Sequence, residues 1–255
     1  IAGGVVVVVK DGQVLLQKGY GYSDVARRRP VSPDATLFRP GSVSKLFTWT
    51  AVMQLVEQDK LDLDRDVNDY LDFKIPAYDG KPITLRNIMT HTTGFEESAR
   101  YTITTKPMNL GKLMKDVVPA RIFPPGVTPA YSNYATALAG YIVQRQSGMS
   151  FDDYIDRNVL RPIGMTRSTF RQPLPANLKP LMSQGYGLAS EKPEDFEFVG
   201  PAPAGSLSAT GADMAKFMIA HLSGGRGLLR PETARMMQGT YLTILPPLNR
   251  MALGF

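Results

Sequence analysis

Strand signals in this chain are confined to its two ends, and a long helical stretch separates them. Two apolar, β-branched runs, 4–9 and 13–22, flank Lys10-Asp11-Gly12, a sequence typical of a tight hairpin turn. Strand signals return only near residues 241–244 and 251–255. This order predicts an α/β (α+β) fold, in which an antiparallel sheet is built from both chain ends and flanked by helices. A mostly helical lobe is inserted between the two halves.

Apolar residues at helical spacing predict a long helix from Ser42 to about Gln58, preceded by a short strand near 36–39. Shorter helices are expected at 85–89, 110–117, 133–147, 151–159, 211–222 and 232–238. We expect one domain over 1–255. Residues 1–60 and 223–255 would form its α/β lobe, and 61–222 its mainly helical lobe.

Ser42-Val43-Ser44-Lys45, at the start of the long helix, is the first candidate for chemistry. Residues three apart in a helix share a face, so the Lys45 ammonium can reach the Ser42 hydroxyl. Ser42 would also lie in the first turn, where free backbone amides favour a developing negative charge. The pattern offers a way to activate a serine without histidine. A capping serine beside a solvated lysine would show the same spacing.

A second pair, Tyr131 and Asn133, lies between a turn built from prolines and a predicted helix. The turn is Phe123-Pro124-Pro125-Gly126, and the helix over 133–147 is apolar and rich in alanine. Two side chains placed in this way can face one cleft. The alternative is an N-cap asparagine beside a half-buried tyrosine.

With both pairs in this order, the chain resembles the serine β-lactamase and penicillin-binding protein superfamily. The resemblance is to the class C β-lactamase-like branch, which includes D-Ala-D-Ala carboxypeptidases, D-aminopeptidases and family VIII carboxylesterases. Further matching segments are Leu37-Phe38-Arg39-Pro40-Gly41-Ser42, Leu61-Asp62-Leu63-Asp64, Met89-Thr90-His91-Thr92-Thr93-Gly94-Phe95, Pro162-Ile163-Gly164-Met165, Gly205-Ser206-Leu207 and Ala212-Asp213-Met214-Ala215-Lys216-Phe217. The resemblance implies a bacterial protein with a β-lactamase/transpeptidase-like fold.

The resemblance also implies roles for the two pairs. Tyr131 would be the base for Ser42 and the acid for the leaving group, Asn133 would bind the acyl side of the substrate, and Lys45 would hold the network. The residues alone leave a second arrangement open, in which burial lowers the pKa of Lys45 and its neutral amine is the base. Lowering a tyrosine pKa by about three units needs about 4 kcal/mol, more than one surface charge pair supplies. A desolvated Lys45 together with a helix N-terminus could supply it, so the sequence leaves both bases open, as well as a shared Lys–Tyr unit.

The third motif of the superfamily, Lys-Thr-Gly or His-x-Gly on a late strand, does not follow Asn133 in this sequence. The sequence also starts at a strand, where relatives carry a preceding helix. We therefore expect the chain to be trimmed at both ends. The sequence leaves open whether the third motif lies beyond Phe255, and in a complete chain full activity would be in doubt. That strand carries half of the oxyanion hole in relatives, and the backbone N–H of Ser42 is expected to supply the other half.

Composition argues against several other classes of protein. The 255 residues include no cysteine and two histidines, which excludes thiolate chemistry and disfavours a histidine metal site. Asp62, Asp64 and Asp66 begin like a calcium loop, but Val67 stands where glycine is required. The net charge of +6 comes from scattered cations, and no run of eighteen apolar residues occurs. Neither nucleic-acid binding nor a membrane span is therefore predicted.

These observations predict a serine hydrolase that forms an acyl-enzyme on small ester or amide substrates, peptide-like molecules and β-lactams included. Esterase- or peptidase-like activity is favoured over dedicated β-lactamase activity. The alternative is a penicillin-binding protein that is acylated, or holds ligand, without efficient turnover. No cofactor or metal is expected. The oligomeric state and the location stay open, with the resemblance favouring the periplasm or secretion.

Overall fold

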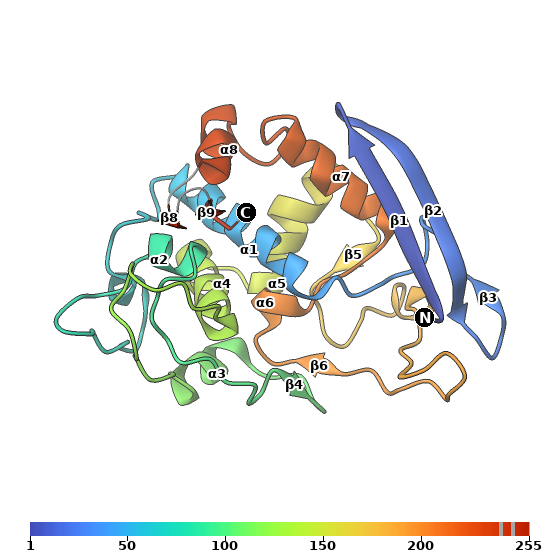
Figure 1. Cartoon of the computed structure of the whole chain (residues 1–255), viewed down its shortest axis with the longest axis horizontal. Helices are drawn as coiled ribbons and strands as arrows, with labels where there is room; N and C mark the ends of the chain where they lie inside the picture. The colour runs from blue at the N-terminus through green and yellow to red at the C-terminus, as the bar shows by residue number, and fades with distance from the viewer. Residues whose placement is uncertain (240–241, 246–247, 255) are drawn as a thin grey trace.

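The computed structural model describes residues 1–239, 242–245 and 248–254 of the chain. Its helices are α1 (Ser44–Val56), α2 (Leu85–Met89), α3 (Leu110–Asp116), α4 (Asn133–Ser147), α5 (Phe151–Ile155), α6 (Ala202–Gly205), α7 (Gly211–Leu222) and α8 (Pro231–Gln238). Its strands are β1 (Gly3–Lys10), β2 (Gln13–Asp24), β3 (Arg29–Pro30), β4 (Ile103–Thr104), β5 (Ser168–Thr169), β6 (Phe198–Val199), β7 (Ser208–Ala209), β8 (Leu242–Leu245) and β9 (Leu248–Met251). Figure 1 shows the long hairpin of β1 and β2 on one side of a helical centre, with α2 and α3 on the other side.

The predicted hairpin forms the core of a three-stranded antiparallel sheet in the order β1-β2-β3. Its turn residues Asp11 and Gly12 both have positive φ, 50° and 73°, as the two central residues of a type I′ hairpin turn require. Helix α7 covers one face of β1. A Cβ atom at Gly211 would lie 2.7 Å from Val5 Cγ2 and 3.0 Å from Val7 Cγ2. Only a glycine at the start of α7 therefore allows this close approach to the sheet.

The mixed α/β class is confirmed, but one detail of the predicted sheet is wrong. The sequence predicts that strands near 241–244 and 251–255 join the sheet of β1. In the described part of the chain, β8 pairs with β9 instead, in the antiparallel register Leu242↔Met251, and Figure 1 places this hairpin near α1 and α2, away from β1. A local hairpin closes its hydrogen bonds within a few residues and avoids the entropy cost of pairing across the whole chain. Tyr241 and Phe255 lie outside the described residues.

Helices α1 and α4 pack against each other in the centre of the molecule. Trp49 and Met53 of α1 are fully buried, as their helical spacing predicts, whereas Leu46 and Val56 are only partly buried. The facing helix α4 is rich in buried alanine, and these small side chains let the two helices approach closely. The predicted helix over 151–159 is α5 followed by a π-helical turn over Asp156–Leu160.

Several helices begin or end at the residues that local capping chemistry specifies. Thr84 and Asn87 form a reciprocal capping box at the start of α2, and Ser132 accepts a hydrogen bond from the backbone of Ala135 at the start of α4. Gly148 ends α4 in the left-handed region with φ 70°. These caps explain why the predicted bounds of α2 and α4 agree with the structure.

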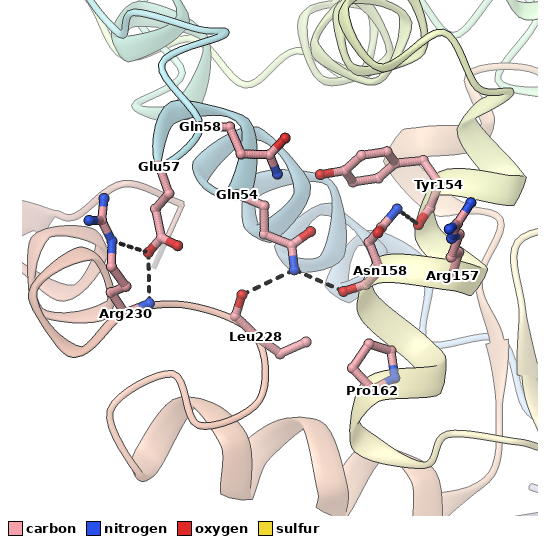
Figure 2. Close-up of a pocket in the computed structure, with 9 residues that line it drawn as sticks. All are labelled: Gln54, Glu57, Gln58, Tyr154, Arg157, Asn158, Pro162, Leu228 and Arg230. Carbon is pink, nitrogen blue, oxygen red and sulfur yellow. Dashed lines mark hydrogen bonds and ion pairs between the residues drawn. The ribbon is translucent and has the colours of Figure 1, made fainter.

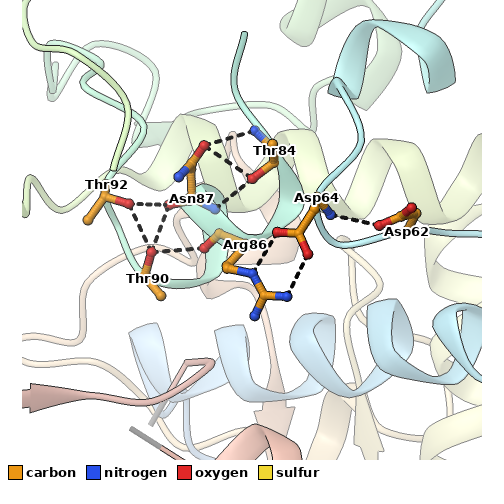
Figure 3. Close-up of polar contacts among 7 residues, drawn as sticks. All are labelled: Asp62, Asp64, Thr84, Arg86, Asn87, Thr90 and Thr92. Atoms are coloured by element: carbon orange, nitrogen blue, oxygen red, sulfur yellow. Dashed lines mark hydrogen bonds and ion pairs between the residues drawn. The ribbon is translucent and has the colours of Figure 1, made fainter. Parts of the chain in front are cut away.

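The acidic cluster that resembles a calcium loop is engaged in protein contacts (Figure 3). Both carboxylate oxygens of Asp64 accept hydrogen bonds from Arg86 at 2.7 Å, and Asp62 accepts one from the backbone of Asp64 at 2.9 Å. The pairing fixes α2 to the segment that follows α1. Within residues 1–239, 242–245 and 248–254, no group of three or more His, Cys, Asp or Glu could hold a metal ion. The same residues contain no helix long and apolar enough to cross a membrane.

Replacing Gly140 by alanine tests the contact between α4 and α6. A Cβ atom at Gly140 would lie 2.4 Å from Pro203 Cγ, so α6 must move away. Alanine normally favours a helix by about 1 kcal/mol over glycine, yet the clash reverses the sign here. We expect Gly140→Ala to lower the free energy of unfolding by about 1–3 kcal/mol, measured by urea denaturation. Gly4→Ala, where a Cβ meets nothing within 4 Å, is the control. Wild-type stability for Gly140→Ala would mean that α6 is not held against α4.

Candidate active site

Ser42 and Lys45 lie where the chain turns into α1. Ser42 occupies a 3₁₀ turn over Gly41–Val43 and is exposed, while Lys45 lies in the first turn of α1 and is only 4% exposed. The Lys45 Nζ atom donates a hydrogen bond to Ser42 Oγ at 3.1 Å. The structure therefore places the predicted pair in direct contact, with the amine on the buried side of the hydroxyl.

Tyr131 and Asn133 reach the same hydroxyl and amine from the start of α4. The Tyr131 hydroxyl donates to Ser42 Oγ at 2.5 Å, and Asn133 Oδ1 accepts from Lys45 Nζ at 2.8 Å. A third acceptor for Lys45 is the backbone carbonyl of Ala204 in α6, at 2.9 Å. All of the residues predicted for the site thus belong to one hydrogen-bonded network, and Ser132 rather than Asn133 caps the helix.

Burial acts in opposite directions on the two titratable groups that contact Ser42. It lowers the pKa of Lys45 to about 8, because the buried ammonium is poorly solvated, and the charge of Glu97 opposes this shift. Burial raises the pKa of the Tyr131 phenol, and the hydrogen bond to Ser42 only partly opposes that change. Near neutral pH the phenol therefore keeps its proton, while the amine is close to losing one.

Glu97 is the charged residue of this network that sequence reasoning missed. Its carboxylate accepts hydrogen bonds from the backbone N of Asn133, at 3.2 Å to each oxygen, and from Asn133 Nδ2 at 2.9 Å. In the sequence it is the second of two adjacent glutamates, Glu96 and Glu97, in a polar stretch with no helical or strand pattern. Such a pair is ordinarily solvated surface, so nothing in the pattern signals its position.

His91 supports the loop that carries Tyr131. Its ring lies 4.6 Å from the Tyr131 ring at an interplanar angle of 30°, and its backbone carbonyl accepts from Ala130 N at 2.7 Å. Its Nδ1 atom faces the backbone N of Ser132 at 3.4 Å. Burial, with a smaller contribution from the Lys45 charge, lowers the pKa of His91 to about 4. The ring is therefore neutral at physiological pH and orders this loop by stacking and hydrogen bonding.

The other serines near this region are engaged in structural contacts. Ser44 donates to the Gly41 carbonyl at 2.6 Å and accepts from Leu207 N at 3.2 Å. Ser206 donates to the Phe170 carbonyl at 2.9 Å. Both hydroxyls are buried, in contrast to the exposed Ser42. Thr210 caps the start of α7, where its hydroxyl accepts from the backbone of Asp213.

A hollow of about 390 Å³ lies at the opposite end of α1 and is separate from this network. Figure 2 shows Gln54 of α1 within it, donating to the backbone carbonyls of Asn158 and Leu228 at 2.8 and 3.1 Å. Glu57 accepts from the backbone of Arg230 at 2.7 Å on another wall. These contacts tie the end of α1 to the π-helical turn and to the segment before α8. Ser42, Lys45, Tyr131 and Asn133 do not line this hollow.

Comparison with known proteins identifies the relatives of this chain. The Beta-lactamase family model matches residues 1–252. Protein flp of Staphylococcus aureus (strain MRSA252) is 30% identical over 177 residues, which cover 68% of this chain and 35% of that protein. The chain therefore spans about a third of the length of this curated relative.

Solved structures give the same result for the fold. The octameric penicillin-binding protein homologue from Pyrococcus abyssi superposes with a TM-score of 0.84 at 26% identity, covering 100% of this chain and 60% of that one. The β-lactamase/D-alanine carboxypeptidase from Pseudomonas syringae superposes with a TM-score of 0.81 at 23% identity, covering 100% and 69%. The predicted β-lactamase/transpeptidase-like fold is thereby confirmed, and the chain belongs to the Beta-lactamase family of the serine β-lactamase and penicillin-binding protein superfamily.

Proposed function

We propose that this chain carries the nucleophilic serine of a serine hydrolase, which becomes acylated by ester or amide substrates. Peptide-like molecules and β-lactams are the amide class. One observation carries the proposal: the exposed Ser42 Oγ atom lies 3.1 Å from the amine of Lys45 and 2.5 Å from the phenol of Tyr131. A serine is a weak nucleophile until a neighbouring base takes its proton. Membership of a family of serine hydrolases supports the same chemistry.

The pKa shifts favour Lys45 over Tyr131 as the base in the free protein, and the hydrogen bonds accommodate that state. An ammonium at Lys45 would donate all its protons, to Ser42, Asn133 and Ala204. A neutral amine keeps two donors, which suffice for Asn133 and Ala204, and turns its lone pair toward Ser42. The serine proton then points at Lys45 while the Tyr131 proton points at Ser42 Oγ. Every group is satisfied, and the pKa of about 8 makes this state accessible near neutral pH.

On this assignment acylation involves three proton transfers. Ser42 Oγ attacks the substrate carbonyl carbon as its proton passes to Lys45 Nζ, and a tetrahedral intermediate forms. Collapse of the intermediate breaks the bond to the leaving group, which takes the proton of Tyr131. The Lys45 ammonium then returns its proton to the phenolate of Tyr131, which lies beside the amine because both groups contact Ser42 Oγ. The net result is that the serine proton leaves with the alcohol or amine, and Lys45 and Tyr131 regain their starting protonation states in the acyl-enzyme.

Negative charge on the tetrahedral intermediate needs hydrogen-bond donors. The backbone N–H of Ser42 lies in the turn that starts α1, where the helix dipole also favours negative charge, and we assign it as one oxyanion donor. Asn133, fixed beside Lys45, is placed to hydrogen-bond the acyl side of the substrate. We propose esterase- or peptidase-like turnover, because these roles require no dedicated geometry for β-lactam deacylation. The alternative, a penicillin-binding protein acylated without turnover, is supported by the relatives that carry that name.

Intact-protein mass spectrometry tests the acyl-enzyme directly. We expect one adduct from a fluorophosphonate in the wild-type chain and none in Ser42→Ala. Ser223→Ala, which removes an exposed serine after α7, should label as the wild type does. Incubation with a penicillin and with an ester then separates the two functions: ester turnover supports the hydrolase, and a lasting penicilloyl adduct without turnover supports the alternative. Labelling that persists in Ser42→Ala would reject both.

The pH profile distinguishes the two candidate bases. The kcat/KM for a p-nitrophenyl ester should rise with pH to a plateau, with a midpoint near 8, because only the neutral amine of Lys45 accepts the serine proton. The free-protein pKa values set this profile. If Tyr131 were the base, the midpoint would lie above the pKa of an ordinary phenol, since burial raises the pKa of Tyr131. A midpoint in that higher range would overturn the assignment of Lys45.

Removing the Tyr131 hydroxyl tests its role as acid. A p-nitrophenolate can leave as the anion, whereas an alcohol or amine leaving group must be protonated as its bond to carbon breaks. We expect Tyr131→Phe to slow hydrolysis of the p-nitrophenyl ester by about tenfold, and of an alkyl ester or amide by about 10²–10⁴-fold. Acylation rates with the two leaving groups provide the measurement, and circular dichroism confirms the fold. Equal losses for both substrates would instead make Tyr131 the base, and no loss would remove it from the mechanism.

A further inference from the structure

We propose that Glu97 is a positioning residue of this reaction: its carboxylate fixes which end of the Asn133 amide faces Lys45, and its charge sets the pH range over which Ser42 is acylated. The carboxylate lies at the start of α4, where it accepts from the backbone N and from Nδ2 of Asn133. Asn133 Oδ1, at the other end of the same amide, accepts from Lys45 at 2.8 Å. This inference rests on the proposed function of Ser42.

The orientation of the Asn133 amide follows from donor and acceptor matching. Glu97 offers only acceptors, and Lys45 donates to this amide whether or not it is charged. A flipped amide would place its oxygen against the carboxylate and its NH₂ group against the Lys45 amine. Both contacts would then be repulsive, so the two neighbours allow a single orientation. Without Glu97 the orientation would depend on the hydrogen bond to Lys45 alone.

The charge of Glu97 acts on Lys45 through the same short chain of contacts. The titratable groups that face Lys45 in the described part of the chain are Glu97, Tyr131 and His91. The Tyr131 phenol keeps its proton well above neutral pH, and the His91 ring is neutral above about pH 4. In the pH range where His91 is neutral and Tyr131 is protonated, the negative charge of Glu97 is therefore the charge that opposes loss of the Lys45 proton. Removing it should let the amine become neutral at lower pH.

Three variants separate orientation from charge. Glu97→Gln keeps one acceptor for Asn133 Nδ2 but removes the charge, and Glu97→Ala removes both. Glu97→Asp restores the charge on a shorter side chain. Glu96→Gln is the matched control, because Glu96 is exposed, as Glu97 is, but the contact shown for it is a bond from its backbone N to the Ala120 carbonyl. It changes the net charge by the same amount beside the site.

The experiment measures p-nitrophenyl ester acylation from pH 5.5 to 10 in each variant. We expect Glu97→Gln to move the midpoint down by about half to one pH unit and to lower the plateau about threefold. Glu97→Ala should show the same shift with a plateau about thirtyfold lower, and Glu97→Asp should keep the wild-type midpoint. An unchanged midpoint in Glu97→Gln, an equal shift in Glu96→Gln, or a wild-type plateau in Glu97→Ala would overturn the proposal.

A second measurement does not require activity. The ¹³Cε signal of Lys45, assigned by its loss in Lys45→Met, reports the titration of the amine by NMR. We expect its midpoint to be lower in Glu97→Gln than in the wild type and unchanged in Glu96→Gln. If Ser42 forms no adduct but this shift is observed, the proposed hydrolase fails while the electrostatic link between Glu97 and Lys45 stands. If the signal titrates at the same pH in all variants, the role of Glu97 in tuning Lys45 is wrong.

Discussion

The buried amine of Lys45 is the interaction on which the arrangement of the site depends. A nearly inaccessible amine must have partners for its protons, since an unpaired charge or donor in the interior costs several kcal/mol. Its acceptors come from segments far apart in the sequence: Ser42 before α1, Asn133 at the start of α4 and Ala204 in α6. The amine can be satisfied only when these segments meet. Packing of α6 on α4 at Gly140 therefore affects the site as well as the core.

The same burial that requires these partners also gives the lysine its chemistry. Removal from water lowers the pKa of the amine and raises that of the phenol, so one environment leaves more of Lys45 as the neutral amine near pH 7 and keeps Tyr131 protonated. Lys45 is thereby suited to accept the serine proton and Tyr131 to donate one, although both contact Ser42 Oγ. Glu97 limits this effect, because its charge keeps part of the stabilisation of the ammonium. The pH range for reaction is thus a balance between desolvation and one nearby carboxylate.

Local chemistry explains which parts of the fold and of the site were predictable from the sequence. The bounds of α2, α4 and α7 follow from capping residues, and the contact of Ser42 with Lys45 follows from helical spacing. The resemblance to a known family is the basis on which Tyr131 and Asn133 were predicted to lie in the same site as Ser42 and Lys45. The contributions of Ala204 and Glu97 could not be predicted in this way: the first is a backbone carbonyl, which any residue supplies, and the second is a loop carboxylate that reaches Asn133 across 36 positions. The pairing of β8 with β9 was missed because the apolar pattern of a strand does not show whether its partner is adjacent in the sequence or distant.

The exposure of the groups around Ser42 indicates how protons move on the proposed mechanism. Lys45 is almost inaccessible to solvent and donates to Ser42, Asn133 and Ala204 beside the ring of Tyr131, whereas Tyr131 is 46% exposed. A proton taken from Ser42 by the amine has no direct path to water, and the acylated Ser42 Oγ cannot carry it, so it leaves by way of the phenol. The exposed phenol is the group that can deliver it to a departing alcohol or amine. Burial of the base and exposure of the acid therefore couple removal of the serine proton to protonation of the leaving group, and they disfavour loss of that proton to solvent.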